Sequence, residues 1–149
     1  MTMQDLTAMI RLPNKIAAMF KKTPRVPKLA VIDDSGMIQN VVLRNFASSH
    51  EVKAYWRLPE DLTELDQFDV LIVDGDGIGN QQFAHGVDFL VEYAPKHPDK
   101  RFVHFTGWCD GRNKEKLKTI GIAVVSKGGR PNELVDAVNG KVKDDGDDA

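Results

Sequence analysis

Short apolar runs alternate with segments of helical periodicity along most of the chain. The runs at 29–32, 70–73, 102–105 and 122–125 are almost wholly apolar, which is typical of strands buried on both faces of a parallel sheet. Residues 50–56 alternate instead, which favours a half-exposed edge strand. The pattern therefore predicts five strands, separated by connections long enough to hold helices.

Helical spacing of apolar residues fills the gaps between these strands. Residues 36–47, 81–94 and 112–120 each place apolar side chains three or four positions apart, and 61–67 is a shorter candidate. Pro131 can begin a last helix, because proline fits the first helical turn. Alternation of strands and helices in this way predicts an α/β fold with a doubly wound parallel sheet.

The two ends of the chain depart from this alternation. We expect residues 1–27 to form an N-terminal helical extension that ends in the proline-containing linker TPRVP. The α/β domain then covers residues 28–142, and residues 143–149 form an acidic, flexible tail. The chain is thus predicted to hold one folded domain with an extension before it.

Composition narrows the class of protein. A chain of 149 residues with 42% hydrophobic and 28% charged residues is ordinary for one soluble domain. No apolar run reaches the roughly 18 residues that a membrane-spanning helix needs. Cys109 is the only cysteine, so no internal disulfide can form. These features predict a cytoplasmic protein without an integral membrane segment.

Charge is spread unevenly along the chain. Residues 1–28 carry a net charge of +5, and residues 29–149 carry −7. So acidic a domain is a poor candidate for nucleic-acid binding. The basic, amphipathic N-terminal extension could pack on the domain, on a second copy in a homodimer, or on a membrane surface.

Polar residues follow several of the predicted strands at the point where each strand ends. Asp33 and Asp34 follow the first strand, Asp74 follows the third, Thr106 the fourth, and Lys127 comes soon after the fifth. In open parallel sheets, ligands bind outside the carboxyl ends of the strands. We therefore expect three carboxylates, a hydroxyl and an ammonium group to converge at one edge of the sheet.

This set of groups is suited to phosphoryl chemistry. Carboxylates held close together repel one another unless a cation joins them, and small sites of oxygen ligands favour Mg²⁺. Such a metal can bind a phosphoryl oxygen. A carboxylate can attack phosphorus to form an aspartyl phosphate, while lysine and threonine bind the remaining phosphoryl oxygens.

The motifs LAVIDDSG, FDVLIVDGDG, VHFTG and VVSKG resemble the receiver domain of bacterial two-component response regulators. The resemblance covers roughly residues 28–142 and depends on the order and spacing of the four motifs. It implies the flavodoxin-like strand order 2-1-3-4-5, of which receivers are themselves a standard example.

The resemblance also implies a role for each residue at the strand ends. Asp74 matches the phosphoacceptor, Thr106 the switch hydroxyl, and Lys127 the lysine that pairs with the phosphoryl group. Asp33 and Asp34 match the acidic pair that holds Mg²⁺ with Asp74, and the backbone carbonyl of Asp76 completes the metal site. A receiver takes its phosphoryl group from a histidine kinase or phosphotransfer protein and then alters a contact with a downstream protein partner. It is a signalling domain and not an enzyme, apart from slow self-dephosphorylation.

Several positions depart from the family pattern. The loop GDGIGNQQFAHG after Asp74 lacks the usual Met-Pro and is longer, Val124 replaces the switch aromatic, and Gly128 replaces the proline after the lysine. These changes motivate an alternative, a receiver-like interaction module that no longer uses phosphate. Trp108 stands two residues after Thr106, where a bulky ring could hinder the water that removes the phosphoryl group.

Two other functions can be drawn from the stretch DVLIVDGDG. It resembles the Asp-x-Asp motif of haloacid-dehalogenase-type phosphatases, with Asp74 as nucleophile, Asp76 as acid–base and the Asp144-Asp145 pair downstream. In that family the motif follows the first strand, whereas two predicted strands precede it here. A calcium loop is weaker still, because Ile78 stands at its third ligand position.

Simpler interpretations exist for each residue. Asp74 could be a plain turn residue, since Asp-Gly is a common turn pair. One of Asp33 and Asp34 could cap the following helix. His104 is expected to be a core histidine with a satisfied hydrogen bond, and Cys109 a structural thiol.

Overall fold

The computed structural model describes residues 25–141 of the chain. The predicted N-terminal helices and the acidic tail lie outside the described residues, so both stay predictions. No helix in the described part of the chain has the length and apolar character needed to cross a membrane.

The domain is built on a five-stranded parallel sheet in the order β2-β1-β3-β4-β5. This is the order that the family resemblance implied, and the predicted α/β fold class is confirmed. β2 lies at one edge of the sheet, as the alternating pattern of residues 50–56 predicted. The strands are β1 (Lys28–Ile32), β2 (Glu51–Tyr55), β3 (Val70–Val73), β4 (Arg101–Thr106) and β5 (Ala123–Ser126).

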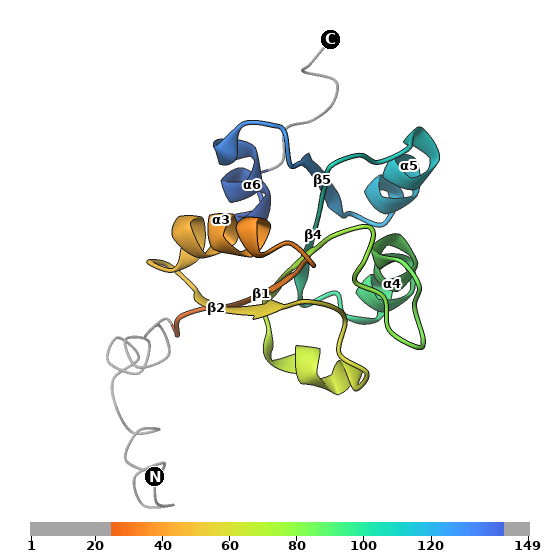
Figure 1. Ribbon diagram of the computed structural model, residues 1–149, viewed down its shortest axis with the longest axis horizontal. Helices are drawn as coiled ribbons and strands as arrows, with labels where there is room; N and C mark the ends of the chain where they lie inside the picture. Colours follow the sequence, from red (N-terminus) through yellow and green to blue (C-terminus); the bar gives the residue numbers. More distant parts are fainter. Residues whose placement is uncertain (1–24, 142–149) are drawn as a thin grey trace, which may run out of the picture.

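Helices cover both faces of the sheet (Figure 1). α3 and α6 lie on one face, where Phe46 and Leu134 join a core with the buried strand residues of that side. α4 and α5 lie on the other face, where Phe89 and Leu117 are fully buried. The helical elements are α3 (Gly36–Phe46), the 3₁₀ helices η1 (Leu62–Gln67) and η2 (Ala94–Lys96), α4 (Gly86–Tyr93), α5 (Gly111–Thr119) and α6 (Pro131–Val138).

The predicted helix over residues 81–94 is wrong at its start, because α4 begins only at Gly86. Residues 75–85 form a long loop that folds back on the domain and buries Ile78 and Phe83. Phe83 therefore contributes to the core from a loop, although its spacing from later apolar residues suggested a helix. Side-chain periodicity cannot separate these two cases, since both bury the same residue.

Hydrogen bonds between strands continue one residue beyond several strand ends. These bonds form because the neighbouring strand has a free carbonyl group at that position. They fix the backbone of the residues that are candidates for the functional site. The bonds run from Asp33 N to Tyr55 O (3.0 Å), from Asp74 N to Ile32 O (2.9 Å) and from Lys127 N to Thr106 O (2.9 Å). The sheet therefore positions the backbone of these residues at its carboxyl edge.

Candidate functional site

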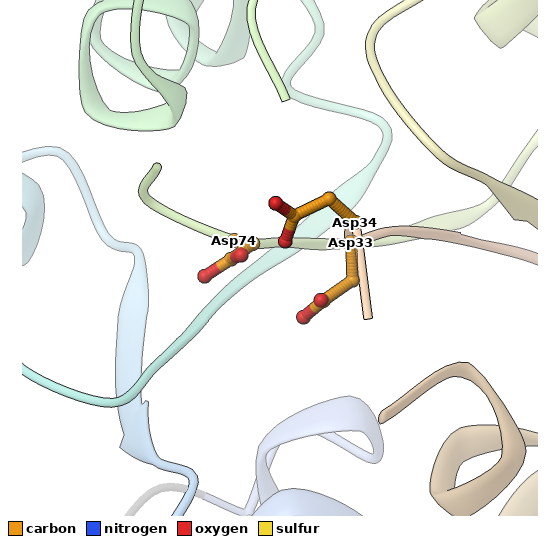
Figure 2. Close-up of side chains that lie close together, drawn as sticks. All are labelled: Asp33, Asp34 and Asp74. Atoms are coloured by element: carbon orange, nitrogen blue, oxygen red, sulfur yellow. The ribbon is translucent and has the colours of Figure 1, made fainter. Parts of the chain in front are cut away.

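Three aspartates cluster where β1 and β3 end (Figure 2). One carboxylate oxygen from each of Asp33, Asp34 and Asp74 lies within 4.8 Å of the others. Asp33 and Asp74 are buried, whereas Asp34 is exposed. The donor set consists of hard oxygen ligands with one face open to solvent, and this suits a partly hydrated Mg²⁺ ion.

Lys127 joins two of the three carboxylates. Its Nζ lies 2.8 Å from Asp33 Oδ2 and 3.0 Å from Asp74 Oδ1, and only 20% of its side chain is exposed. Burial by itself would lower the pKa of Lys127, but the hydrogen bonds and charges of the two carboxylates outweigh it, so the pKa is raised. The lysine is therefore firmly charged at neutral pH.

Whereas the surroundings of Lys127 stabilise its charged form, those of Asp74 disfavour its charged form. Burial raises the pKa of its carboxyl, and the nearby charge of Asp33 raises it further. The hydrogen bond from Lys127 opposes these effects without overcoming them. One ammonium group shared by two buried carboxylates leaves each of them incompletely neutralised, so the site attracts a further cation.

Backbone donors fix the orientation of the two buried carboxylates. Gly75 N–H donates to Asp74 Oδ1 at 2.8 Å, on the same oxygen that Lys127 contacts. Ser35 N–H donates to Asp33 Oδ1 at 2.9 Å. Ser35 is also the residue that caps α3, since its Oγ accepts from Ile38 N. The alternative in which Asp33 or Asp34 caps this helix is therefore wrong.

Two glycines bring the loop after Asp74 directly against the site. Gly77 has a φ of +80°, and a Cβ there would collide with the carboxylate of Asp34. A Cβ on Gly86 would collide with the carbonyl oxygen of Asp74. Glycine is favoured at position 77 because of its positive φ, and it is required at position 86 because the Asp74 backbone occupies the space that a side chain would need.

The rest of this loop is anchored to the segment that follows β2. Asn80 organises it: its amide donates to the Pro59 carbonyl at 2.9 Å, and its Oδ1 accepts from Phe83 N at 2.8 Å. Leu58 N–H donates to the carbonyl of Ile78, whose side chain is fully buried. A buried isoleucine cannot ligate calcium, which is further reason to reject a calcium loop.

The side chain of Asp76 is separate from the carboxylate cluster. It is 96% exposed, and its Oδ1 lies 3.3 Å from His85 Nδ1. Its expected metal contact involves the backbone carbonyl and stays a prediction. This exposed position is unlike the acid–base position that the phosphatase interpretation required. The Asp144-Asp145 pair of that interpretation lies outside the described residues.

Thr106 stands at the end of β4 and is buried. Its hydroxyl donates to the carbonyl of Trp108 at 2.9 Å, so it is engaged with the loop that follows β4. The Trp108 side chain is 79% exposed. The hydroxyl must exchange this partner before it can bind a phosphoryl oxygen.

Known protein structures similar to this chain are receiver domains. The beryllofluoride-activated receiver domain of DrrB matches with a TM-score of 0.64 and 20% identity, over 78% of this chain and 97% of that one. A CheY-like receiver from Methanospirillum hungatei matches with a TM-score of 0.64 and 16% identity, over 78% and 94%. CheY4 of Vibrio cholerae matches with a TM-score of 0.62 and 19% identity, over 79% and 100%.

The chain has the fold of a receiver domain. At these identities the similarity concerns the fold alone. Neither the protein-family models nor the curated proteins gave any match. The comparisons therefore assign no role to an individual residue, and any such role must be argued from the geometry of the site.

In this receiver fold, the structure brings together the residues that the sequence placed at strand ends. Asp33, Asp34, Asp74 and Lys127 form one cluster, and Thr106 lies beside the turn at Gly75, a Cβ on which would be 3.5 Å from Thr106 Oγ1. Their roles in metal binding and phosphoryl transfer stay predictions. Three further residues contribute to the site and were not predicted from the sequence.

Gln39, Gly86 and His104 are these missed contributors. Gln39 donates to the Asp33 carbonyl at 2.9 Å, and Gly86 packs on the Asp74 backbone. His104 was correctly expected to be a buried histidine with a satisfied hydrogen bond, but its position beside the turn at Gly75 was not foreseen. No motif marks these residues, because their contacts depend on how helices and strands pack.

Proposed function

We propose that this protein is a response-regulator receiver that accepts a phosphoryl group on Asp74 with the help of Mg²⁺. Phosphorylation would then switch a contact with another protein in a phosphorelay. The observation that carries the proposal is the arrangement of Lys127 between Asp33 and Asp74, with Asp34 beside them, at the carboxyl edge of a receiver fold.

The carboxylates would share the work of holding the ion and receiving the phosphoryl group. Asp33, Asp34 and Asp74 would hold Mg²⁺ together with the Asp76 carbonyl, and the ion would neutralise charge on the phosphoryl oxygens. Lys127 and Gly75 N–H both contact Asp74 Oδ1, which leaves Oδ2 as the candidate nucleophile. The exposed face of Asp34 marks the side from which a phosphodonor can approach.

The transfer itself is a simple displacement at phosphorus. Asp74 Oδ2 forms a bond to phosphorus as the bond from phosphorus to the donor atom breaks, and the electron pair of that bond stays with the donor. The Lys127 ammonium would move from Asp33 toward the transferred group, and the Thr106 hydroxyl would leave the Trp108 carbonyl for a phosphoryl oxygen. Both movements change the loops that follow β4 and β5.

The proposed partners follow from this chemistry. The donor would be a histidine kinase or phosphotransfer protein, and a downstream protein would read the changed surface. The protein would act in the cytoplasm, possess no nucleic-acid-binding role in this domain, and could form a homodimer through its N-terminal extension.

Phosphorylation by acetyl phosphate tests the proposal. Wild-type protein should become labelled in the presence of Mg²⁺, and chelation of Mg²⁺ should abolish the labelling. Asp74→Asn should remain unlabelled, whereas Asp76→Asn, which changes an exposed side chain in the same loop, should retain most of the labelling. Equal labelling of wild type and Asp74→Asn would remove Asp74 as the acceptor.

The departures at Val124, Gly128 and the loop after Asp74 favour one alternative, an interaction module that does not use phosphate. Beryllofluoride, a mimic of the phosphoryl group, separates the two functions. A Mg²⁺-dependent change in tryptophan fluorescence on its addition supports the receiver, and no change supports the interaction module. Steady hydrolysis of a generic phosphate ester, abolished by Asp76→Asn, would instead favour the phosphatase.

A further inference from the structure

A histidine ring lies beside the turn that carries Asp74. His104 is in β4 and only 1% exposed, and its Nδ1 lies 3.0 Å from the Val73 carbonyl oxygen. Because a carbonyl can only accept, Nδ1 must carry a proton. Burial lowers the pKa of His104 although the bond to Val73 favours the charged ring. The ring is therefore neutral at physiological pH, with its proton on Nδ1.

The His104 ring lies next to Gly75, which has no side chain. A Cβ on Gly75 would lie 3.5 Å from His104 Cε1 and 3.5 Å from Thr106 Oγ1, which is ordinary contact distance. A methyl group would fit, but a longer side chain would have to displace the ring or the hydroxyl. On the other side, His104 is in register with Val124 of β5, a smaller aliphatic neighbour. The ring thus fits between a glycine turn and an edge strand.

The backbone around Asp74 is held at successive residues. Asp74 N–H donates to Ile32 O at 2.9 Å, and Gly86 N–H donates to Gly75 O at 2.8 Å. His104 adds a side-chain donor to the Val73 carbonyl, immediately before Asp74. The Gly75 N–H donates to Asp74 Oδ1, and hydrogen bonds to the neighbouring peptide groups restrain its direction. A change at Val73 therefore reaches the carboxylate through two peptide units.

We propose that His104 is a positioning residue for Asp74, holding the Val73–Gly75 turn so that the carboxylate faces the incoming phosphoryl group. The imidazole does not touch that group. It restrains the peptide units on which the direction of the Asp74 carboxylate depends. This inference depends on the proposed function, since it concerns the same acceptor site.

Three substitutions in the full chain test the role. His104→Leu keeps apolar volume and removes the donor, whereas His104→Asn keeps a short side-chain N–H that can reach the Val73 carbonyl. Phe105→Leu is the matched control, because Phe105 is buried from the same strand but joins the core on the opposite face of the sheet. Phosphorylation by acetyl phosphate with Mg²⁺ is followed over a range of donor concentrations.

His104→Leu should lower the maximal phosphorylation rate about tenfold without changing the donor concentration for half-maximal rate. His104→Asn should restore the rate to within about threefold of wild type, and Phe105→Leu should leave it unchanged. A wild-type rate in His104→Leu, or a rate in His104→Asn as low as in His104→Leu, would overturn the inference.

An NMR measurement without any phosphodonor separates this inference from the proposed function. His104→Leu and His104→Asn both remove the imidazole ring current, so the amide resonance of Gly75 is compared between these two variants. It should differ between them, with His104→Asn nearer to wild type, and it should stay in place in Phe105→Leu. The same Gly75 amide position in His104→Leu and His104→Asn would overturn the positioning role even if Asp74 is phosphorylated. Absence of phosphorylation in wild type, together with the expected shifts, would overturn the proposed function alone.

Discussion

The ammonium group of Lys127 bridges Asp33 and Asp74, at 2.8 Å from one carboxylate and 3.0 Å from the other. It occupies the position of a counterion between two buried acids. Since a divalent cation at the same cluster would compete with this ammonium for the carboxylates, lysine and metal are coupled in this site.

Removal of the lysine charge should therefore tighten Mg²⁺ binding. We expect Lys127→Met to raise the Mg²⁺ affinity about tenfold, because Asp33 and Asp74 then lack their fixed cation. Isothermal titration of wild type and variant with MgCl₂ measures the change. Lys96→Met, which removes an exposed lysine paired with Glu92, is the control for loss of one charge. Equal affinities for wild type and Lys127→Met would contradict the coupling.

The glycine at 77 should prove necessary for the position of Asp34. Gly77→Ala places a methyl group against the Asp34 carboxylate and forces alanine into a left-handed conformation, so it should destabilise the fold by about 1–2 kcal/mol and weaken Mg²⁺ binding. Gly121→Ala is a close control, because Gly121 has a φ of +81° with open space around it. It should show the loss of stability alone, as measured by urea unfolding. A variant at 77 with unchanged Mg²⁺ affinity would show that the contact with Asp34 is unimportant.

Trp108 should slow the loss of phosphate from Asp74. Its carbonyl holds the Thr106 hydroxyl, and its ring is exposed on the loop that follows β4. We expect Trp108→Ala to speed dephosphorylation by about threefold or more, because less of the site is then shielded from water. The decay of phosphorylated protein after removal of acetyl phosphate gives the rate. An unchanged rate would rule out this shielding, and Trp56→Ala serves as the control for loss of an exposed tryptophan.

Acid should weaken the anchor at the opposite edge of the sheet. Arg25 donates to both oxygens of Asp69, and Lys28 N–H donates to Oδ2 at 2.8 Å. The Arg25 hydrogen bond holds the pKa of Asp69 below its ordinary value of 3.8, although burial acts against it. A lowered pKa means that this stabilisation is complete above pH 3.8 and is lost as the pH falls through the lowered pKa.

Asp69→Asn should therefore lower the melting temperature at neutral pH, with a loss of about 1 kcal/mol. The difference from wild type should shrink as the pH is taken below 3.8. Thermal unfolding across this range measures both effects. A difference that stays constant with pH would show that the charge of Asp69 is not responsible. Asp136→Asn, on α6, controls for the general effect of removing one carboxylate.

The sequence by itself determined the order of the elements and most of their types. Nearly continuous apolar runs are typical of strands buried on both faces, so the pattern predicted strands covered by helices at 29–32, 70–73, 102–105 and 122–125. Because the carboxyl ends of parallel strands meet at one edge, the same pattern also placed Asp33, Asp74 and Lys127 together. Strand order came from the family resemblance and not from the pattern.

Only the tertiary structure decided how the site is arranged in detail. The loop at 75–85 buries Ile78 and Phe83 without forming a helix, and Gly77 and Gly86 let its backbone lie against two aspartates. The hydrogen bond between His104 and the Val73 carbonyl links two strands that are neighbours in space but far apart in the chain. Local periodicity carries no information about such contacts, since they arise from packing between elements and not from spacing within one.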